Sequence, residues 1–94
     1  MFDTLRFEWD PQKAAINRTK HKVSFEEAVT VLGDSFGRIT DDPRHSNTEE
    51  RHVFLRQSAR RRLLVVMFTE RGQAIRLISV RKATRHERGE YEKK

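Results

Sequence analysis

Positively charged side chains gather near the end of the sequence, where the pattern of a strand gives way to that of a helix. Residues 74–80 alternate, with Ile75, Leu77 and Ser79 on one side and Arg76, Ile78 and Val80 on the other. Arg81, Lys82 and Arg85 follow at the expected start of the helix. Guanidinium, ammonium and helix-start N–H groups all bind phosphate, so this junction is a candidate anion site. A basic strand end that is only solvated is the alternative.

The predicted alternation places Arg76 and Arg81 on opposite faces of this strand. Arg76 projects from the face opposite Ile75 and Leu77, which favours a cation that faces a substrate over a core residue. Arg81 has the parity of the core face. It must therefore lie past the end of the strand to contact a ligand.

The histidines and the absence of cysteine limit the metal and thiol chemistry of the chain. His21, His45, His52 and His86 form neither an HxH nor an HExxH spacing, and three of them have strongly basic neighbours. We therefore expect no metal site and no cofactor. A chain without cysteine has no disulfide, no thiolate zinc site and no thiol nucleophile.

Length and charge set the class of the protein. The 94 residues, 35% of them hydrophobic, predict a single domain over residues 1–94 with one modest core. Residues 1–50 carry 7 Lys and Arg against 10 Asp and Glu, whereas residues 51–94 carry 13 against 4. The positive field of the second half predicts an anionic partner, either nucleic acid or an acidic protein. No apolar run matches a signal peptide or membrane span, so we expect a cytoplasmic protein without a membrane partner.

The first third of the chain predicts a strand and two short helices that must position these cations. Residues 5–9 alternate, so Leu5, Phe7 and Trp9 are expected to pack inward. Asp10 as N-cap and Pro11 after it predict a helix to about Lys20. Its narrow apolar stripe consists of Ala14, Ala15 and Ile16.

A capping box predicts the second helix. Ser24 stands at its N-cap and Glu27 three residues later, and Gly33 is expected to end it. Its expected apolar face consists of Phe25, Ala28, Val29 and Leu32.

The remaining residues predict a sheet. Residues 36–40 form a weak strand, 41–47 a loop and 49–57 a strand whose two faces are equally apolar. The apolar run 63–68 is typical of a central strand, and Arg71-Gly72 turns it into the last strand as an antiparallel hairpin. The predicted class is α+β: an N-terminal strand and a helical hairpin packed on an antiparallel sheet, closed by a C-terminal helix.

The last helix is poorly supported by the sequence. Gly89 interrupts it, and its apolar residues are only Ala83 and Tyr91. Such a helix is loosely docked, is completed by a partner, or is weakly fixed by Tyr91 and the Arg88–Glu92 spacing.

Motifs along most of the chain resemble those of the BrnT family of toxins. They are Phe7-Glu8-Trp9-Asp10, Asn17, Lys20-His21, residues 23–28, Glu50-Arg51, residues 64–66, 69–71 and 76–84, Glu87-Arg88 and Tyr91. The resemblance implies the toxin half of a type II toxin–antitoxin pair with a fold similar to the RelE-like ribonucleases. The chain departs from the family at Lys22 and at 60–62, where glycine is usual, and at Val80, where alanine is.

The resemblance implies a metal-independent endoribonuclease that inhibits translation. RNA cleavage removes a proton from a 2′-hydroxyl, stabilises charge on phosphorus and protonates a leaving oxygen. We expect Arg76 and Arg81 to hold the phosphate, with Lys20, Glu50 and His21 as candidates for proton transfer. The expected RNA-binding residues are Arg51, Lys82, Arg85 and Tyr91.

The expected partners are RNA, free or presented on the ribosome, and a cognate antitoxin. The resemblance implies a BrnA-like, DNA-binding antitoxin in a hetero-oligomeric complex. The alternative from another class is a non-enzymatic basic module that only binds nucleic acid or an acidic protein.

Overall fold

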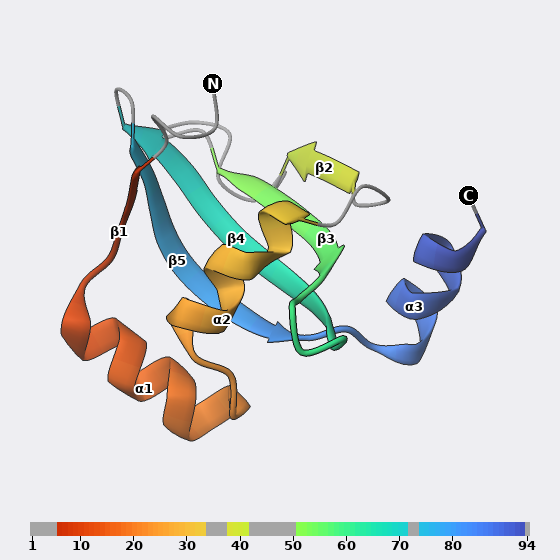
Figure 1. Cartoon of the computed structure of the whole chain (residues 1–94), viewed down its shortest axis with the longest axis horizontal. Helices are drawn as coiled ribbons and strands as arrows, with labels where there is room; N and C mark the ends of the chain where they lie inside the picture. The colour runs from red at the N-terminus through yellow and green to blue at the C-terminus, as the bar shows by residue number, and fades with distance from the viewer. Residues whose placement is uncertain (1–5, 34–37, 42–50, 72–73, 94) are drawn as a thin grey trace.

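A computed structural model of the chain describes residues 6–33, 38–41, 51–71 and 74–93 (Figure 1). Along the chain the described elements are β1 (Arg6–Glu8), α1 (Pro11–His21), α2 (Phe25–Val29), the 3₁₀ turn η2 (Thr30–Gly33), β2 (Arg38–Asp41), β3 (His52–Gln57), β4 (Leu63–Arg71), β5 (Ala74–Lys82) and α3 (Arg85–Glu92). The predictions for Leu5, His45, Glu50 and Gly72, and for most of the loop 41–47, concern residues outside this part. None of the described helices is both long and apolar enough to cross a membrane.

The described strands form one sheet in the order β1-β5-β4-β3-β2. The run 63–68 lies in β4 at the middle of this order, which confirms the predicted central strand. The α+β class is also confirmed. The predicted antiparallel sheet holds for β2 to β5, and the N-terminal strand predicted to pack on it joins it as a parallel edge strand, β1, beside β5. This pairing places Phe7 opposite the buried Ile75, so the first strand extends the core at the sheet edge.

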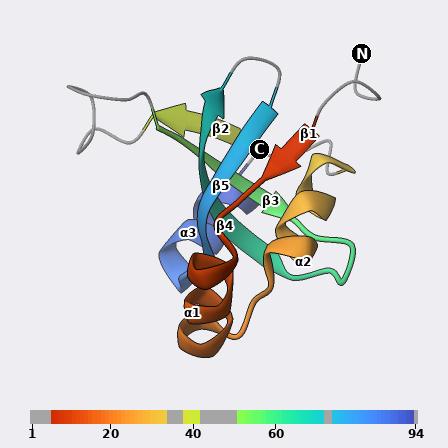
Figure 2. The ribbon, with the colours of Figure 1, turned by 90° about the vertical axis from the view of Figure 1, so that its left-hand side faces the viewer.

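The helices α1 and α2 cover one face of the sheet. Leu64, Val66 and Phe68 alternate toward this core face from β4. Phe54 joins them from β3, and its ring centroid lies 4.3 Å from that of Phe68. The remaining core residues are Val23, Phe25, Ala28, Val31, Ile75, Leu77 and Val80. Figure 2 shows α2 and α3 on opposite sides of the sheet.

A β-bulge in β5 changes which side chains face the core. Met67 pairs with Ser79 and Phe68 with Leu77, so Ile78 is the extra residue. Val80 is therefore fully buried on the same face as Leu77, which corrects the predicted alternation. The core parity predicted for Arg81 is wrong for the same reason.

The buried side chain of α1 is an amide. Asp10 caps the helix as predicted, accepting from the Gln12 N–H at 2.9 Å. The predicted apolar stripe is confirmed for Ala14, which packs against the core, but wrong for Ile16, which is 65% exposed, and Asn17 is buried instead. The Asn17 amide nitrogen donates to the Val80 carbonyl at 2.9 Å, and its oxygen accepts from the Val80 N–H at 3.1 Å. The pairing of β1 with β5 ends at Arg76, so this amide takes the place of a neighbouring strand at Val80.

Glu27 has a different partner from the one predicted. The Ser24 hydroxyl accepts from the Glu27 N–H at 3.0 Å, so the N-cap is confirmed. The Glu27 carboxylate, however, turns into the protein, where it accepts from Arg62 Nε at 3.0 Å and from the Ser58 hydroxyl at 2.7 Å. The Arg62 guanidinium is the main cause that lowers the pKa of Glu27 below its usual range. This ion pair ties α2 to the turn between β3 and β4.

Candidate active site

The face of the sheet opposite the core carries three polar side chains of β5. Arg76, Ser79 and Arg81 pair with Thr69, Met67 and Val65 of β4, which alternate with the core residues of that strand. Arg51 reaches the same face, where its Nη1 lies 4.0 Å from the Met67 sulfur. We call Arg51, Arg76, Ser79 and Arg81 the basic face. The bulge therefore brings both predicted phosphate-binding arginines to one face, with Ser79 between them.

Arg76 is held by a weak ion pair. Its Nη1 lies 3.3 Å from Glu8 Oε2, and the two side chains are 32% and 43% exposed. Partly exposed pairs of this kind contribute little stability. A phosphate could therefore exchange with the Glu8 carboxylate at small cost.

Arg81 is engaged by a carboxylate from α3. Arg81 Nη1 and Nη2 each lie 2.9 Å from one oxygen of Glu87. The same carboxylate accepts from the Thr84 N–H at 2.8 Å, and the Thr84 hydroxyl accepts from the Glu87 N–H at 3.1 Å, which completes a capping box. Hydrogen bonds from Arg81 first, and from Thr84, lower the pKa of Glu87 to about 2 against the opposing effect of burial.

The strand-to-helix junction thus holds an anionic group, but the group belongs to the chain itself. Glu87 occupies the position expected for a phosphate, with the guanidinium on one side and the helix-start N–H on the other. Lys82 and Arg85 are exposed beside it. A phosphate that binds the same edge of the Arg81 guanidinium must replace Glu87, which offers the same two-oxygen geometry.

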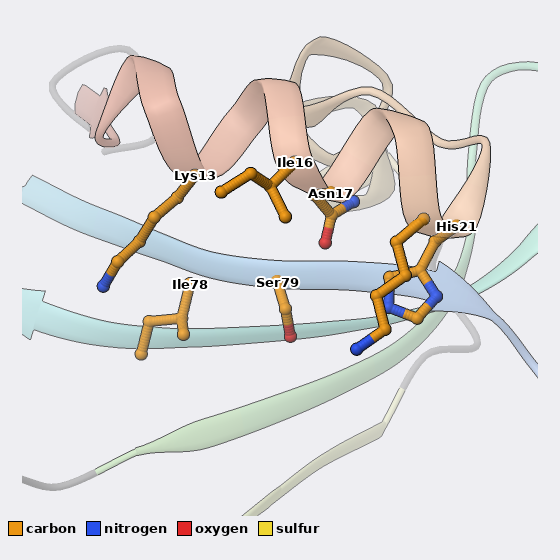
Figure 3. A pocket seen from close by; sticks show the side chains of 7 residues that line it. Lys13, Ile16, Asn17, His21, Ile78 and Ser79 are labelled. Carbon is orange, nitrogen blue, oxygen red and sulfur yellow. The ribbon is translucent and has the colours of Figure 1, made fainter.

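A pocket of about 200 Å³ lies between α1 and the edge of β5 (Figure 3). It brings together the predicted Lys20 and His21 with Ser79 of the basic face. Its lining is completed by Lys13, Ile16, Asn17 and Ile78. The Asn17 bonds to Val80 fix the helix, which forms one wall of this pocket, against the strand that forms the other.

Five of the seven pocket residues, among them Lys13 and Ser79, were not predicted as site residues. Lys13 lies seven residues before Lys20, so the helical repeat alone could have placed both on one face. Ser79 was assigned to the core side, because a bulge leaves no local signal in the sequence. Tyr91 is half-buried in α3, away from the pocket, and Glu50 lies outside the described residues.

The comparisons with known proteins agree on one family. The family model of the ribonuclease toxin, BrnT, of type II toxin–antitoxin systems matches residues 9–87. The crystal structure of the Brucella abortus ribonuclease toxin, BrnT, superposes with a TM-score of 0.67 at 20% identity, covering 86% of this chain and 99% of that one. No curated protein matches. The match over most of its length shows that the chain belongs to the BrnT family of ribonuclease toxins.

Proposed function

We propose that this chain is an endoribonuclease toxin that cleaves RNA, inhibits translation and is neutralised by a cognate antitoxin. The observation that carries the proposal is the meeting of the basic face with the pocket at Ser79. Cations that can hold a phosphate thereby lie next to groups that can move protons. The RelE-like fold that the resemblance implies is part of the same proposal.

Each side chain has a role in this reaction. Arg76 and Arg81 hold the phosphate and stabilise the charge that develops on its oxygens. His21 and Lys20 are the candidates for proton transfer at the edge of β5. Glu50 remains a further candidate. None of these steps needs a metal ion, so we expect cleavage to persist in EDTA.

The exchange of Glu87 for a phosphate at Arg81 links substrate binding to α3. When the phosphate binds, the Glu87 carboxylate is released, while the Thr84 hydroxyl can still cap the helix. Arg85 and Lys82 stand next to the released position and can contact the neighbouring phosphates of the strand. Arg51 and Tyr91 are the other expected RNA contacts.

An antitoxin that covers the basic face and α3 would block this exchange. None of the residues of α3 is buried, so the helix presents ample surface to a partner. The expected partner is BrnA-like, acidic where it contacts the toxin, and DNA-binding. Hydrogen exchange of residues 81–93 should slow when the complex forms. Slower exchange only in α2 would place the interface elsewhere.

The decisive experiment compares RNA cleavage by Arg76→Ala and Arg81→Ala with that by wild type, in the presence of EDTA. Loss of one electrostatic stabiliser of a transition state typically lowers a rate about 100- to 1,000-fold. Lys93→Ala, which removes an exposed cation from the end of α3, is the control and should cleave normally. Growth inhibition should likewise be lost in Arg76→Ala and Arg81→Ala and kept in the control variant.

Two outcomes would refute the assignment. If folded Arg76→Ala and Arg81→Ala variants cleave RNA at the wild-type rate, these arginines do not hold the scissile phosphate. If wild type binds RNA with strong salt dependence but never cuts it, even on ribosomes, the non-enzymatic binding module becomes the better description.

A further inference from the structure

A second cluster of cations lies on the side of the sheet that α2 covers, outside the candidate active site. It surrounds a hollow of about 280 Å³ between the α1–α2 turn and the β3–β4 turn. The lining residues are Arg18, Lys22, Ser24, Glu27, Arg60 and Arg62. We call this cluster the basic hollow. Four of its six residues are cationic, and one is an anion.

Glu27, the single anion of the basic hollow, already has hydrogen-bonding partners within the chain. The Glu27 carboxylate is buried and binds Arg62 and Ser58, and the nearest nitrogen of Arg60 lies 4.0 Å from it. Within the described part of the chain, no ion pair holds Arg18 or Lys22. The Arg60 side chain is 74% exposed. The hollow therefore keeps a positive charge that its own residues do not neutralise.

The backbone around the hollow is strained at cationic residues. Lys22 and Arg61 have φ angles of 62° and 64°, and they are the described non-glycine residues with positive φ. Left-handed backbone costs an L-residue roughly 1 kcal/mol, which glycine avoids. Lys22 follows α1 at the position where helices commonly end with glycine. Lys22 lines the hollow, and Arg61 lies between two of its lining residues, Arg60 and Arg62. Cations at positions that favour glycine motivate a functional hypothesis for this hollow.

We propose that the basic hollow is a second RNA-binding site, which holds backbone phosphates of the substrate strand away from the cleaved bond. The proposal rests on the RNA-cleaving function proposed above. None of the described residues that line the basic hollow is apolar, whereas the centre of a protein–protein interface is apolar. Contacts to phosphate need only cations and a fixed backbone. The chemistry therefore fits a phosphodiester chain better than an acidic segment of the antitoxin.

The geometry of α1 connects the two sites. Lys20 and His21 line the pocket at the edge of β5, and Lys22 follows them directly in the basic hollow. Arg62 also donates from its Nη2 to the Lys22 carbonyl at 3.5 Å, so the two turns hold each other in place. A single strand that passes the end of α1 can contact both sites. Its length, and not its sequence, decides whether it reaches the second one.

The test is a double variant, Lys22→Gly and Arg60→Gln, that removes two cations without weakening the fold. Glycine suits the left-handed backbone at position 22, and Arg62 is kept because it pairs with Glu27. The control, Arg88→Gln and Lys93→Gln, removes two exposed cations from α3, outside the basic hollow and the basic face. The probe is a fully 2′-O-methylated 20-nucleotide RNA, which lacks the hydroxyl needed for cleavage.

Binding is measured by fluorescence anisotropy between 50 and 200 mM salt. For a single strand, each lost phosphate contact makes the negative slope of log K against log salt less steep by about 0.7. The slope of the double variant should therefore be less steep than that of wild type by about 1.4. The control should keep the wild-type slope. With cleavable RNA, KM should rise for a 20-nucleotide substrate and stay unchanged for a trinucleotide, while kcat is constant for both.

Each contrary result has its own meaning. A folded double variant with the wild-type slope and KM overturns the second RNA site. Unchanged RNA binding with weaker antitoxin binding also overturns it, and assigns the hollow to the protein partner. A wild type that cuts no RNA, together with a reduced slope in the double variant, refutes the proposed nuclease but keeps the RNA-binding hollow.

Discussion

Replacement of Asn17 by aspartate tests the contact that joins α1 to β5. Asp has the shape of Asn but cannot donate, so the Val80 and Val23 carbonyls would lose bonds that are 2.9 and 3.1 Å long. The Val80 N–H would keep its acceptor. A buried acceptor left without its donor costs about 1–3 kcal/mol, so the two together cost about 2–6 kcal/mol. A stability of 0.05–0.15 kcal/mol per residue gives a chain of this length about 5–14 kcal/mol in total.

The assay is urea unfolding followed by circular dichroism at two pH values. With a slope of about 1.5 kcal/mol per molar urea, a loss of about 4 kcal/mol lowers the midpoint by roughly 2–3 M at pH 7. Gln12→Glu makes the same chemical change at an exposed position in the first turn of α1, where a negative charge is favourable. This control should leave the midpoint unchanged or raise it slightly.

The pH dependence of the Asn17→Asp defect gives the stricter test. Burial against two carbonyl oxygens should raise the pKa of the new carboxyl above its unfolded value. The folded variant then binds more protons, so its deficit relative to wild type is complete at pH 7 and shrinks toward pH 4. A deficit below about 1 kcal/mol, or one equal at both pH values, would show that the Asn17 amide does not pair with Val80 as described.

Three further predictions concern α2 and α3. Gly89→Ala should raise stability by about 0.5–1 kcal/mol in thermal unfolding, since a Cβ there meets no atom within 4 Å; a lower melting temperature would contradict this. The contribution of Glu87 to α3 should be present above pH 4.5 and lost as the pH falls toward its pKa of about 2, so the protection factors of the α3 amides, relative to free amides at the same pH, should fall in acid; Glu87→Gln should abolish that response. Glu27→Gln should cost about 2–4 kcal/mol in urea unfolding because Arg62 loses its counter-charge, and adding Arg62→Met should recover part of the loss; additive costs would refute the coupling.

The sequence predicted those features that depend on neighbouring residues. Asp10 and Ser24 cap α1 and α2 as expected, because a side chain that bonds an N–H two or three residues later needs nothing from the rest of the fold. The central position of β4 was predictable as well. A strand covered on both faces must be apolar throughout, and this pattern does not depend on which strands pair with it or in which register.

The same local rule gave opposite outcomes at two glutamates. Thr84 and Glu87 have the spacing of a capping box and form one, although the sequence analysis did not identify it. Glu27 stands at the same distance from Ser24, but its carboxylate binds Arg62 instead. A partner 35 residues away decides this difference, and the local motif carries no information about it.

Which side chains reach the candidate site depends on the pairing between strands, and the sequence does not show this pairing directly. A single bulge residue, Ile78, changes the face of Arg81 from the core side to the side of Arg76. Asn17 entered the sequence analysis only as a motif residue, because its amide finds its partners at Val80, where the pairing of β1 with β5 has ended. The pocket that joins Lys20 to Ser79 follows from both effects together.

Some contacts that shape the candidate site also hold the fold together. Substitutions at those contacts should lower both stability and activity, whereas substitutions at others should lower activity alone. Asn17 fixes the helix of Lys20 and His21 against the strand of Arg81, and its loss should disturb the pocket and the core at once. Arg81 is different, because its carboxylate partner lies on a helix without buried residues. The proposed exchange of Glu87 for a phosphate would therefore leave the core closed. This division places the rigid part of the site on α1 and the exchangeable part on α3.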